Sequence, residues 1–212
     1  ILGKNPSDWD IATNARPEII RAIFDCTIPT GLKYGTITVR MQNQFFEVTT
    51  FRKDGRYEKN RRPEGVSFTE RIEEDLARRD FTINAMAYNK QKGLLDFFGG
   101  IKDLGMKRIK CVGNPQIRFE EDALRMLRAI RFATQLGFYI QSETAQAILE
   151  RGPLLKQISS ERVRDELDKI LLAQKPSLGL YNIAKLDLLQ FILPIPIKAT
   201  SLTSRSIQSA GI

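Results

Sequence analysis

The alternation of hydrophobic and polar residues predicts a β-hairpin in the first quarter of the chain. Residues 35–41 ("GTITVRM") and 45–51 ("FFEVTTF") are rich in β-branched and aromatic side chains and alternate in part. The short "QNQ" between them suits a tight connection between antiparallel strands. Residues 17–25 ("PEIIRAIFD") have apolar residues at helical spacing behind a proline, which is favoured in a first helical turn.

A basic segment follows the predicted hairpin. Residues 52–65 ("RKDGRYEKNRRPEG") hold six Lys and Arg residues and almost no apolar ones, which predicts a solvated loop. Beyond it, residues 84–89 ("NAMAYN") and 93–104 ("GLLDFFGGIKDL") predict a second pair of short strands that ends in a Gly-Gly turn.

The pattern becomes helical after residue 118. In residues 119–138 ("FEEDALRMLRAIRFATQLGF") apolar side chains recur every three or so positions, and Gly137 is the expected end of that helix. Residues 159–174 and 175–193 continue with helical spacing, whereas 194–212 have no usable period. The sequence therefore predicts an α+β protein, with a mixed-sheet head at 1–110, a helical neck at 111–175, and the start of a helical body with an irregular tail at 176–212.

Composition narrows the class of partner. The 212 residues are 42% hydrophobic, as in a globular protein, and their formal net charge of +8 favours a polyanion such as nucleic acid. No apolar run approaches the roughly 18 residues of a membrane-spanning helix. The two cysteines argue against a disulfide scaffold and fit a reducing cytoplasm, so a cytoplasmic protein is expected.

The absence of histidine limits the possible chemistry. It removes Ser-His-Asp and Cys-His mechanisms and His-ligated zinc sites from this segment. Neither the G-x-x-x-x-G-K-[ST] phosphate loop nor the G-x-G-x-x-G fingerprint is present. Any catalysis must use carboxylates, arginines and a metal ion.

Three acidic residues are candidates to hold that metal. Asp8 and Asp10 in "SDWDIAT" point the same way on a strand, either as a polar strand end or as a pair that binds a cation. Glu47 lies on the opposite face from Phe46 and Val48, either facing solvent or completing a carboxylate cluster. If the two strands are adjacent, the three acids converge as ligands for Mg²⁺, and two such ions roughly 3.5–4 Å apart could support phosphoryl transfer.

Two further motifs suit nucleotide recognition. In "EEDLARRDFTINAMAYN", Arg78 and Arg79 are either surface charges or two guanidinium groups that bind a triphosphate. Asp80 either caps the next turn or accepts a hydrogen bond from a ribose hydroxyl. In "EEDALRMLR", Asp122 and Arg125 are three apart on one predicted helix, either as an ion pair or as an acceptor and a donor. The second arrangement matches the base edges of C and A and rejects those of U and G.

Six motifs occur in the order of one known family: "DWDIAT", "FEVTTFR", "RRDFTINAMA", "DFFGGIKDL", "EEDALRMLRAIRFA" and "SERVRDELDKIL". With them the chain resembles the class II tRNA nucleotidyltransferases, or CCA-adding enzymes, and the related bacterial poly(A) polymerases. The resemblance extends from the first residue to about Gln190.

The resemblance implies a polymerase-β-like nucleotidyltransferase head, in which Asp8 and Asp10 bind metal and Glu47 is the third catalytic carboxylate. Asp80 would read the ribose, Asp122 and Arg125 would be the amino-acid template for CTP and ATP, and residues 96–103 would form a hinge between head and neck. The implied nucleotide-binding set is Arg78, Arg79, Asp80, Asn84, Asp122, Arg125, Arg128 and Arg131. The implied flexible loop contains Arg52, Asp54, Arg56, Arg61 and Arg62, and the neck support is Glu161 and Arg162.

The expected activity is Mg²⁺-dependent addition of CCA, or of its terminal A, from CTP and ATP to the 3′ ends of tRNA. The basic loop favours this reading, because the resemblance connects it with addition of the final A. A poly(A) polymerase and an inactive tRNA-binding relative are the alternatives. Relatives carry Gly-Gly and Arg-Asp motifs upstream of the metal ligands, so we expect this chain to begin just after them and its helical body to be cut short after about residue 190.

Overall fold

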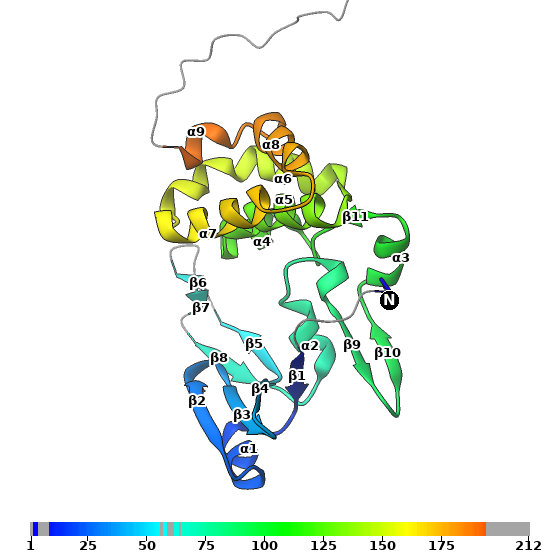
Figure 1. The fold of residues 1–212 in the computed structure, drawn as a ribbon, viewed down its shortest axis with the longest axis vertical. Coiled ribbons are helices and arrows are strands. Elements are labelled where there is room, and N and C mark those ends of the chain that lie inside the picture. Colours follow the sequence, from blue (N-terminus) through cyan, green and yellow to red (C-terminus); the bar gives the residue numbers. More distant parts are fainter. Residues whose placement is uncertain (1, 4–8, 56, 59–61, 64, 194–212) are drawn as a thin grey trace, which may run out of the picture.

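The computed structural model describes residues 2–3, 9–55, 57–58, 62–63 and 65–193. A sheet-containing part and a helical part lie at opposite ends of the molecule, with two-stranded ribbons between them (Figure 1). The predicted α+β class, with a mixed sheet before a helical region, is confirmed. Within the described residues no helix combines the length and apolar character needed to cross a membrane.

The sheet has four strands in the order β1-β4-β3-β2. Its strands and the helix beside it are β1 (Asp10–Thr13), α1 (Pro17–Ile23), β2 (Thr27–Gly31), β3 (Thr36–Met41) and β4 (Gln44–Thr50), with a short 3₁₀ helix at Leu32–Tyr34. The predicted hairpin β3/β4 is confirmed, and its two connecting residues, Gln42 and Asn43, have the positive φ of a tight hairpin turn. The predicted helix α1 packs Ile20 against Ile37 and Val39. Strand β1 pairs with β4 in parallel, which makes the sheet mixed.

The described residues of the basic segment form strands and not the loop that its composition predicted. Strand β5 (Arg52–Asp54) pairs with β8 (Val66–Phe68), and β6 (Tyr57–Glu58) pairs with β7 (Arg62–Pro63). The prediction was wrong here because a two-stranded ladder satisfies backbone groups without needing apolar side chains. The side chains of Arg52 and Asp54 are mostly shielded from solvent, with 17% and 8% exposed.

The connection between sheet and helices begins with α2 (Ile72–Ala77) and a 3₁₀ turn at Thr82–Asn84. The second predicted strand pair is confirmed as β9 (Met86–Asn89) and β10 (Gly93–Asp96), after which Gly99 turns the chain with φ +77°. The Asp96 carboxylate accepts the backbone N–H groups of Gly100 and Ile101 and so holds the start of α3 (Gly100–Gly105).

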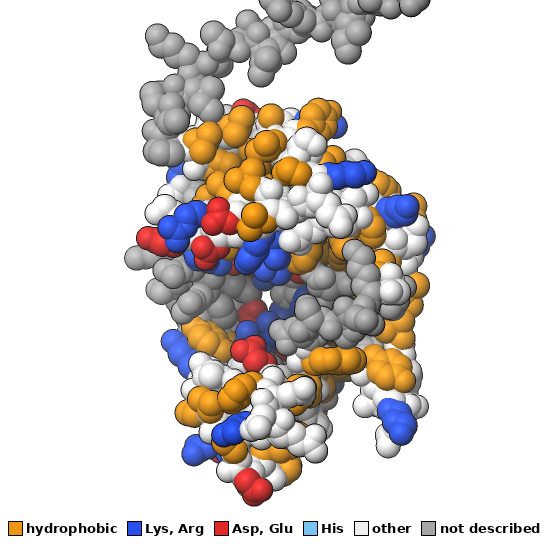
Figure 2. All heavy atoms as spheres, viewed as in Figure 1, with side chains coloured by type: hydrophobic (Ala, Val, Ile, Leu, Met, Phe, Trp, Pro, Cys, Tyr) orange, Lys and Arg blue, Asp and Glu red, His pale blue; other side chains and the backbone are white. Residues whose placement is uncertain are grey.

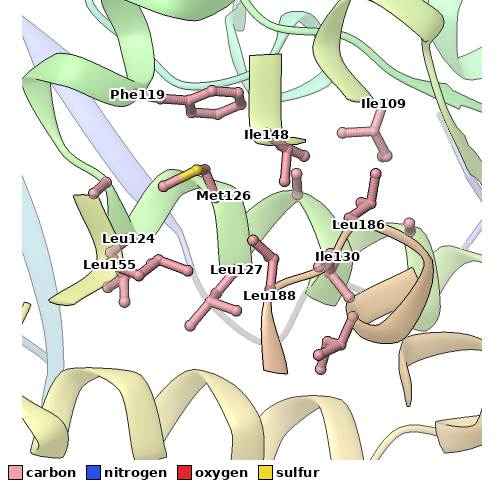
Figure 3. Packing of buried hydrophobic residues seen from close by; sticks show 14 of the residues in the cluster. Ile109, Phe119, Leu124, Met126, Leu127, Ile130, Ile148, Leu155, Leu186 and Leu188 are labelled. Atoms are coloured by element: carbon pink, nitrogen blue, oxygen red, sulfur yellow. The ribbon is translucent and has the colours of Figure 1, made fainter. Parts of the chain in front are cut away.

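The helical part surrounds α5. Its remaining helices are α4 (Pro115–Glu121), α5 (Leu124–Leu136), α6 (Ser142–Arg151), η3 (Gly152–Gln157), α7 (Ser160–Leu171), α8 (Pro176–Lys185) and α9 (Leu189–Ile192), and β11 (Arg108–Ile109) pairs with β12 (Tyr139–Ile140). Leu127 and Ile130 of α5 pack with Ile148, Leu186 and Leu188 in one large hydrophobic core (Figure 3). The same core includes Phe81 and Ile83. The chain therefore enters this core directly after Asp80.

The single helix predicted from residue 119 is two helices with a break at Asp122. This residue has extended dihedrals, φ −147° and ψ 105°, and its Oδ1 accepts the backbone N–H of Leu124 at 3.0 Å. A short acidic side chain competes with the helix for backbone donors, which explains why helical spacing alone missed the break. The predicted end at Gly137 is confirmed, with φ +68°.

Candidate nucleotide site

A polar cleft of about 600 Å³ lies where the head meets the helical part. Its lining residues are Asp10, Arg78, Arg79, Asp80, Asn84, Asp122, Leu124, Arg125, Arg128, Phe132 and Arg162. In Figure 2 basic and acidic side chains gather in the hollow between the two ends of the molecule. Because five of these residues are arginines and three are aspartates, the cleft favours a ligand with several negative charges.

Asp10 and Glu47 are direct register partners on the parallel strands β1 and β4. Opposite residues on neighbouring strands project from the same sheet face, and both of these residues are exposed to solvent. Asp8, the other predicted metal ligand, lies outside the described residues, among which no group of three potential metal ligands occurs. Two exposed carboxylates on one sheet face form a donor set that fits Mg²⁺.

Arg78 and Arg79 follow the last turn of α2 and are held by its buried carboxylate, Asp75. The Nε and Nη2 atoms of Arg78 donate to Asp75 Oδ1 at 3.0 and 2.9 Å. Arg79 Nη2 lies 3.6 Å from Asp75 Oδ2, and Arg79 Nη1 donates to the backbone oxygen of Asn84 at 3.4 Å. The two guanidinium groups are therefore fixed at one side of the cleft.

Asp80 is a buried carboxylate with partners on both oxygens. Its Oδ1 accepts the backbone N–H of Phe81 at 2.8 Å and the side-chain amide of Asn84 at 3.2 Å. Its Oδ2 pairs with Arg128 of α5, at 2.8 Å from Nε and 2.6 Å from Nη2. This pair joins the segment after α2 to the helical part, and a ribose hydroxyl bound to Asp80 would have to share or replace one of these contacts.

Asp122 and Arg125 both line the cleft, and each has a separate partner. Asp122 Oδ2 accepts from Arg162 of α7 at 2.9 Å, whereas Arg125 Nη1 donates to Glu121 at 2.6 Å. Arg125 also donates to the backbone oxygen of Arg78 at 3.3 Å. The predicted supporting role of Arg162 thus has a direct contact in the structure.

Two guanidinium nitrogens of cleft-lining residues are buried without a hydrogen-bond partner in the described part of the chain. Arg79 Nε and Arg162 Nη1 are shielded from water and have no hydrogen-bond partner among the described residues. Buried donors are rarely left unpaired in folded proteins. Because both nitrogens are shielded, acceptor oxygens of a bound ligand would pair with them only after the two side chains move.

Several predicted site residues do not line this cleft. Arg131 points to α7, where its Nε lies 2.9 Å from Glu166 Oε2, and burial lowers the pKa of its guanidinium while Glu166 opposes that shift. Glu161 is exposed in the first turn of α7. The loop residues Arg52 and Asp54 belong to β5, and Arg62 to β7; Arg56 and Arg61 lie outside the described residues.

The sequence analysis did not predict three residues of the site. They are Asp75 behind the arginine pair, Glu121 beside Arg125, and Phe132 in the cleft wall. The spacing of Asp75, three and four residues before the arginines, is an available signal, because such residues are neighbours on a helix. Phe132 has apolar spacing typical of core, and only the packing places it in the cleft.

Comparison with known proteins identifies the head. Residues 1–110, just over half of the 212 residues, match the family described as the poly A polymerase head domain. The chain belongs to the poly A polymerase head-domain family. Residues 137–198 match a second family, described as the probable RNA and SrmB-binding site of polymerase A.

Among relatives of this head-domain family, the CCA-adding enzyme of Limosilactobacillus reuteri is 47% identical over 191 residues, covering 90% of this chain and 47% of that protein. The crystal structure of Bacillus stearothermophilus CCA-adding enzyme in complex with CTP matches with TM-score 0.81 and 42% identity, covering 88% of this chain and 45% of that one. The Thermotoga maritima CCA-adding enzyme complexed with tRNA matches with TM-score 0.72 and 27% identity, covering 90% and 44%. The chain spans about half the length of the curated relatives it matches.

Proposed function

We propose that the chain is the nucleotide-selecting and catalytic part of an enzyme that adds C and A from CTP and ATP to the 3′ end of tRNA. The observation that carries this proposal is the cleft. It combines Asp10, beside Glu47, with an arginine pair and with Asp122 and Arg125. The net charge of +8 and the similarity to CCA-adding enzymes, one solved with CTP and another with tRNA, support the same reading.

In this reaction the 3′ hydroxyl of the tRNA attacks the α-phosphorus of the nucleotide, a new phosphodiester bond forms, and pyrophosphate leaves. Arg78 and Arg79 would bind the phosphates, because planar guanidinium groups donate in pairs to phosphate oxygens. Asp8 and Asp10, together with Glu47, would hold Mg²⁺ ions, which when bound activate the attacking hydroxyl and offset the charge of the leaving pyrophosphate.

Base selection would use Asp122 and Arg125. Cytosine and adenine each present an amino donor beside a ring-nitrogen acceptor, so an aspartate acceptor and an arginine donor match both bases. Arg162 fixes the acceptor, and Glu121 fixes the donor, before a nucleotide arrives. Such preorganisation lowers the entropy cost of binding. Asp80 and Arg128 would bind the sugar and the phosphates of the same nucleotide.

The decisive experiment gives the full-length protein Mg²⁺, tRNA lacking CCA, and CTP or ATP alone and together. Addition of C and then A, stopping after three nucleotides, supports the proposal. Asp10→Asn should abolish transfer, while the control Asp25→Asn, at an exposed position, should leave the rate unchanged. Transfer without Mg²⁺ would contradict the proposed metal requirement.

A poly(A) polymerase is the second candidate, because the head matches a family of that description. In the same assay it would extend RNA with a long A tract and would not add C. Binding of tRNA without any transfer would instead identify an inactive relative, and would overturn the catalytic roles given to Asp10 and Glu47.

A further inference from the structure

The carboxylate of Asp75 lies behind the cleft and does not line it. Helix α2 carries three consecutive acids, of which Glu73 is on the surface and Asp75 is only 2% exposed. A carboxylate is seldom buried so completely unless cations surround it. Because Asp75 is absent from the cleft lining, any effect it has on a bound nucleotide must act through its neighbours.

Those neighbours come from two separate segments. Asp75 Oδ1 accepts two N–H groups of Arg78 and also the backbone N–H of Arg52, at 3.2 Å, where β5 begins. Asp75 Oδ2 faces Arg79 at 3.6 Å. One carboxylate therefore holds both cleft arginines and ties them to the first residue of the β5/β8 ribbon.

We propose that Asp75 is the positioning residue that holds Arg78 and Arg79 as a preformed pair of phosphate-binding forks. This inference rests on the nucleotide-binding role proposed for the cleft. Two adjacent guanidinium groups repel each other, and in a cleft lined by five arginines they would separate or turn to solvent unless a fixed negative charge lay between them.

The position of the ribbon is coupled to the same carboxylate. Asp54 of β5 lies 3.4 Å from Arg52 Nε and 4.0 Å from Arg78 Nη1, so the ribbon contacts the arginine pair by a second route.

Preorganised donors lose less conformational freedom when a ligand binds. Removal of the Asp75 charge should therefore weaken nucleotide binding more than it slows the chemical step.

The test is equilibrium binding of ATP and of CTP to the full-length protein carrying Asp75→Asn. The substitution keeps the size of the side chain and removes its charge. We expect Kd for both nucleotides to rise at least about tenfold and KM to rise with it, with kcat changed less than threefold and tRNA affinity unchanged. Glu73→Gln removes an exposed charge from the same helix and is the matched control, with no change expected.

A folded Asp75→Asn protein, with wild-type circular dichroism, that binds ATP and CTP as tightly as wild type would overturn the inference. If Asp75→Asn does not fold, Asp75→Ser is the second variant, because it also removes the charge, and unchanged nucleotide Kd in that variant would have the same meaning. A wild-type protein that binds neither nucleotide would refute the proposed function itself. The two failures are therefore distinguishable.

Discussion

The contact between Arg131 and Glu166 predicts a role for Arg131 that differs from nucleotide binding. Both side chains are largely buried, at 13% and 5% exposed, and the pair joins α5 to α7. Glu166→Gln would leave the guanidinium charge in place without its carboxylate. Breaking a buried pair in this way typically costs about 3–5 kcal/mol of unfolding free energy.

The structure places the expected cost at the lower end of that range. The ring centroid of Phe132 lies 4.3 Å from the guanidinium carbon of Arg131, and a cation over an aromatic face keeps part of its stabilisation when the carboxylate is lost. A loss of about 3 kcal/mol would lower Tm by roughly 6–12 °C in a protein of this size. The control Asp165→Asn, at a neighbouring position of α7 where the carboxylate is 61% exposed, should change Tm by less than about 2 °C.

Thermal unfolding followed by circular dichroism measures this loss of stability. Binding of ATP and CTP, measured well below the unfolding transition, tests whether Arg131 takes part in nucleotide binding. We expect Glu166→Gln to lower Tm while Kd for both nucleotides stays within twofold of wild type. An unchanged Tm with a tenfold weaker Kd would refute the structural assignment and return Arg131 to the nucleotide-binding set.

Four further outcomes are expected. Asp122→Ala should relax the preference for C and A over U and G by about 10- to 100-fold in kcat/KM, measured by competing nucleotides, with little change in the Mg²⁺ requirement; unchanged selectivity would exclude the template role. Gly179→Ala should destabilise by about 1–2 kcal/mol despite its better helix propensity, because a Cβ there would collide with a side chain of α7, whereas Gly105→Ala, which has open space, should not lower Tm. Burial raises the pKa of Cys111 from 9.0 to about 12, so at pH 8 a thiol reagent should modify only the exposed Cys26 in the folded protein and both thiols in denaturant. Between pH 9 and 12 the unfolded protein binds fewer protons at Cys111, so unfolding free energy measured by denaturant titration should fall as pH rises.

Local signals were sufficient for much of the fold. The hairpin β3/β4 has a two-residue side-chain period and a turn that tolerates positive φ, and both properties are written in adjacent residues. The end of α5 at Gly137 depends only on the freedom of one glycine. The order of six motifs identified the family and named most residues that line the cleft. A short motif is defined by its residue types and their spacing, so it can be found without the structure around it.

Contacts between distant segments were decided by the tertiary structure. Asp10 lies beside Glu47 only because β1 adds to the sheet in parallel, a pairing between segments 37 residues apart that no local pattern specifies. Helical spacing around Asp122 could not reveal that its carboxylate would take a backbone donor and break the helix. The burial of Asp75 and the partner of Arg131 likewise depend on how helices pack, because a charged side chain has the same local pattern whether water or another chain segment surrounds it. The sequence by itself thus predicted most of the residues that line the cleft, and packing decided which of them meet.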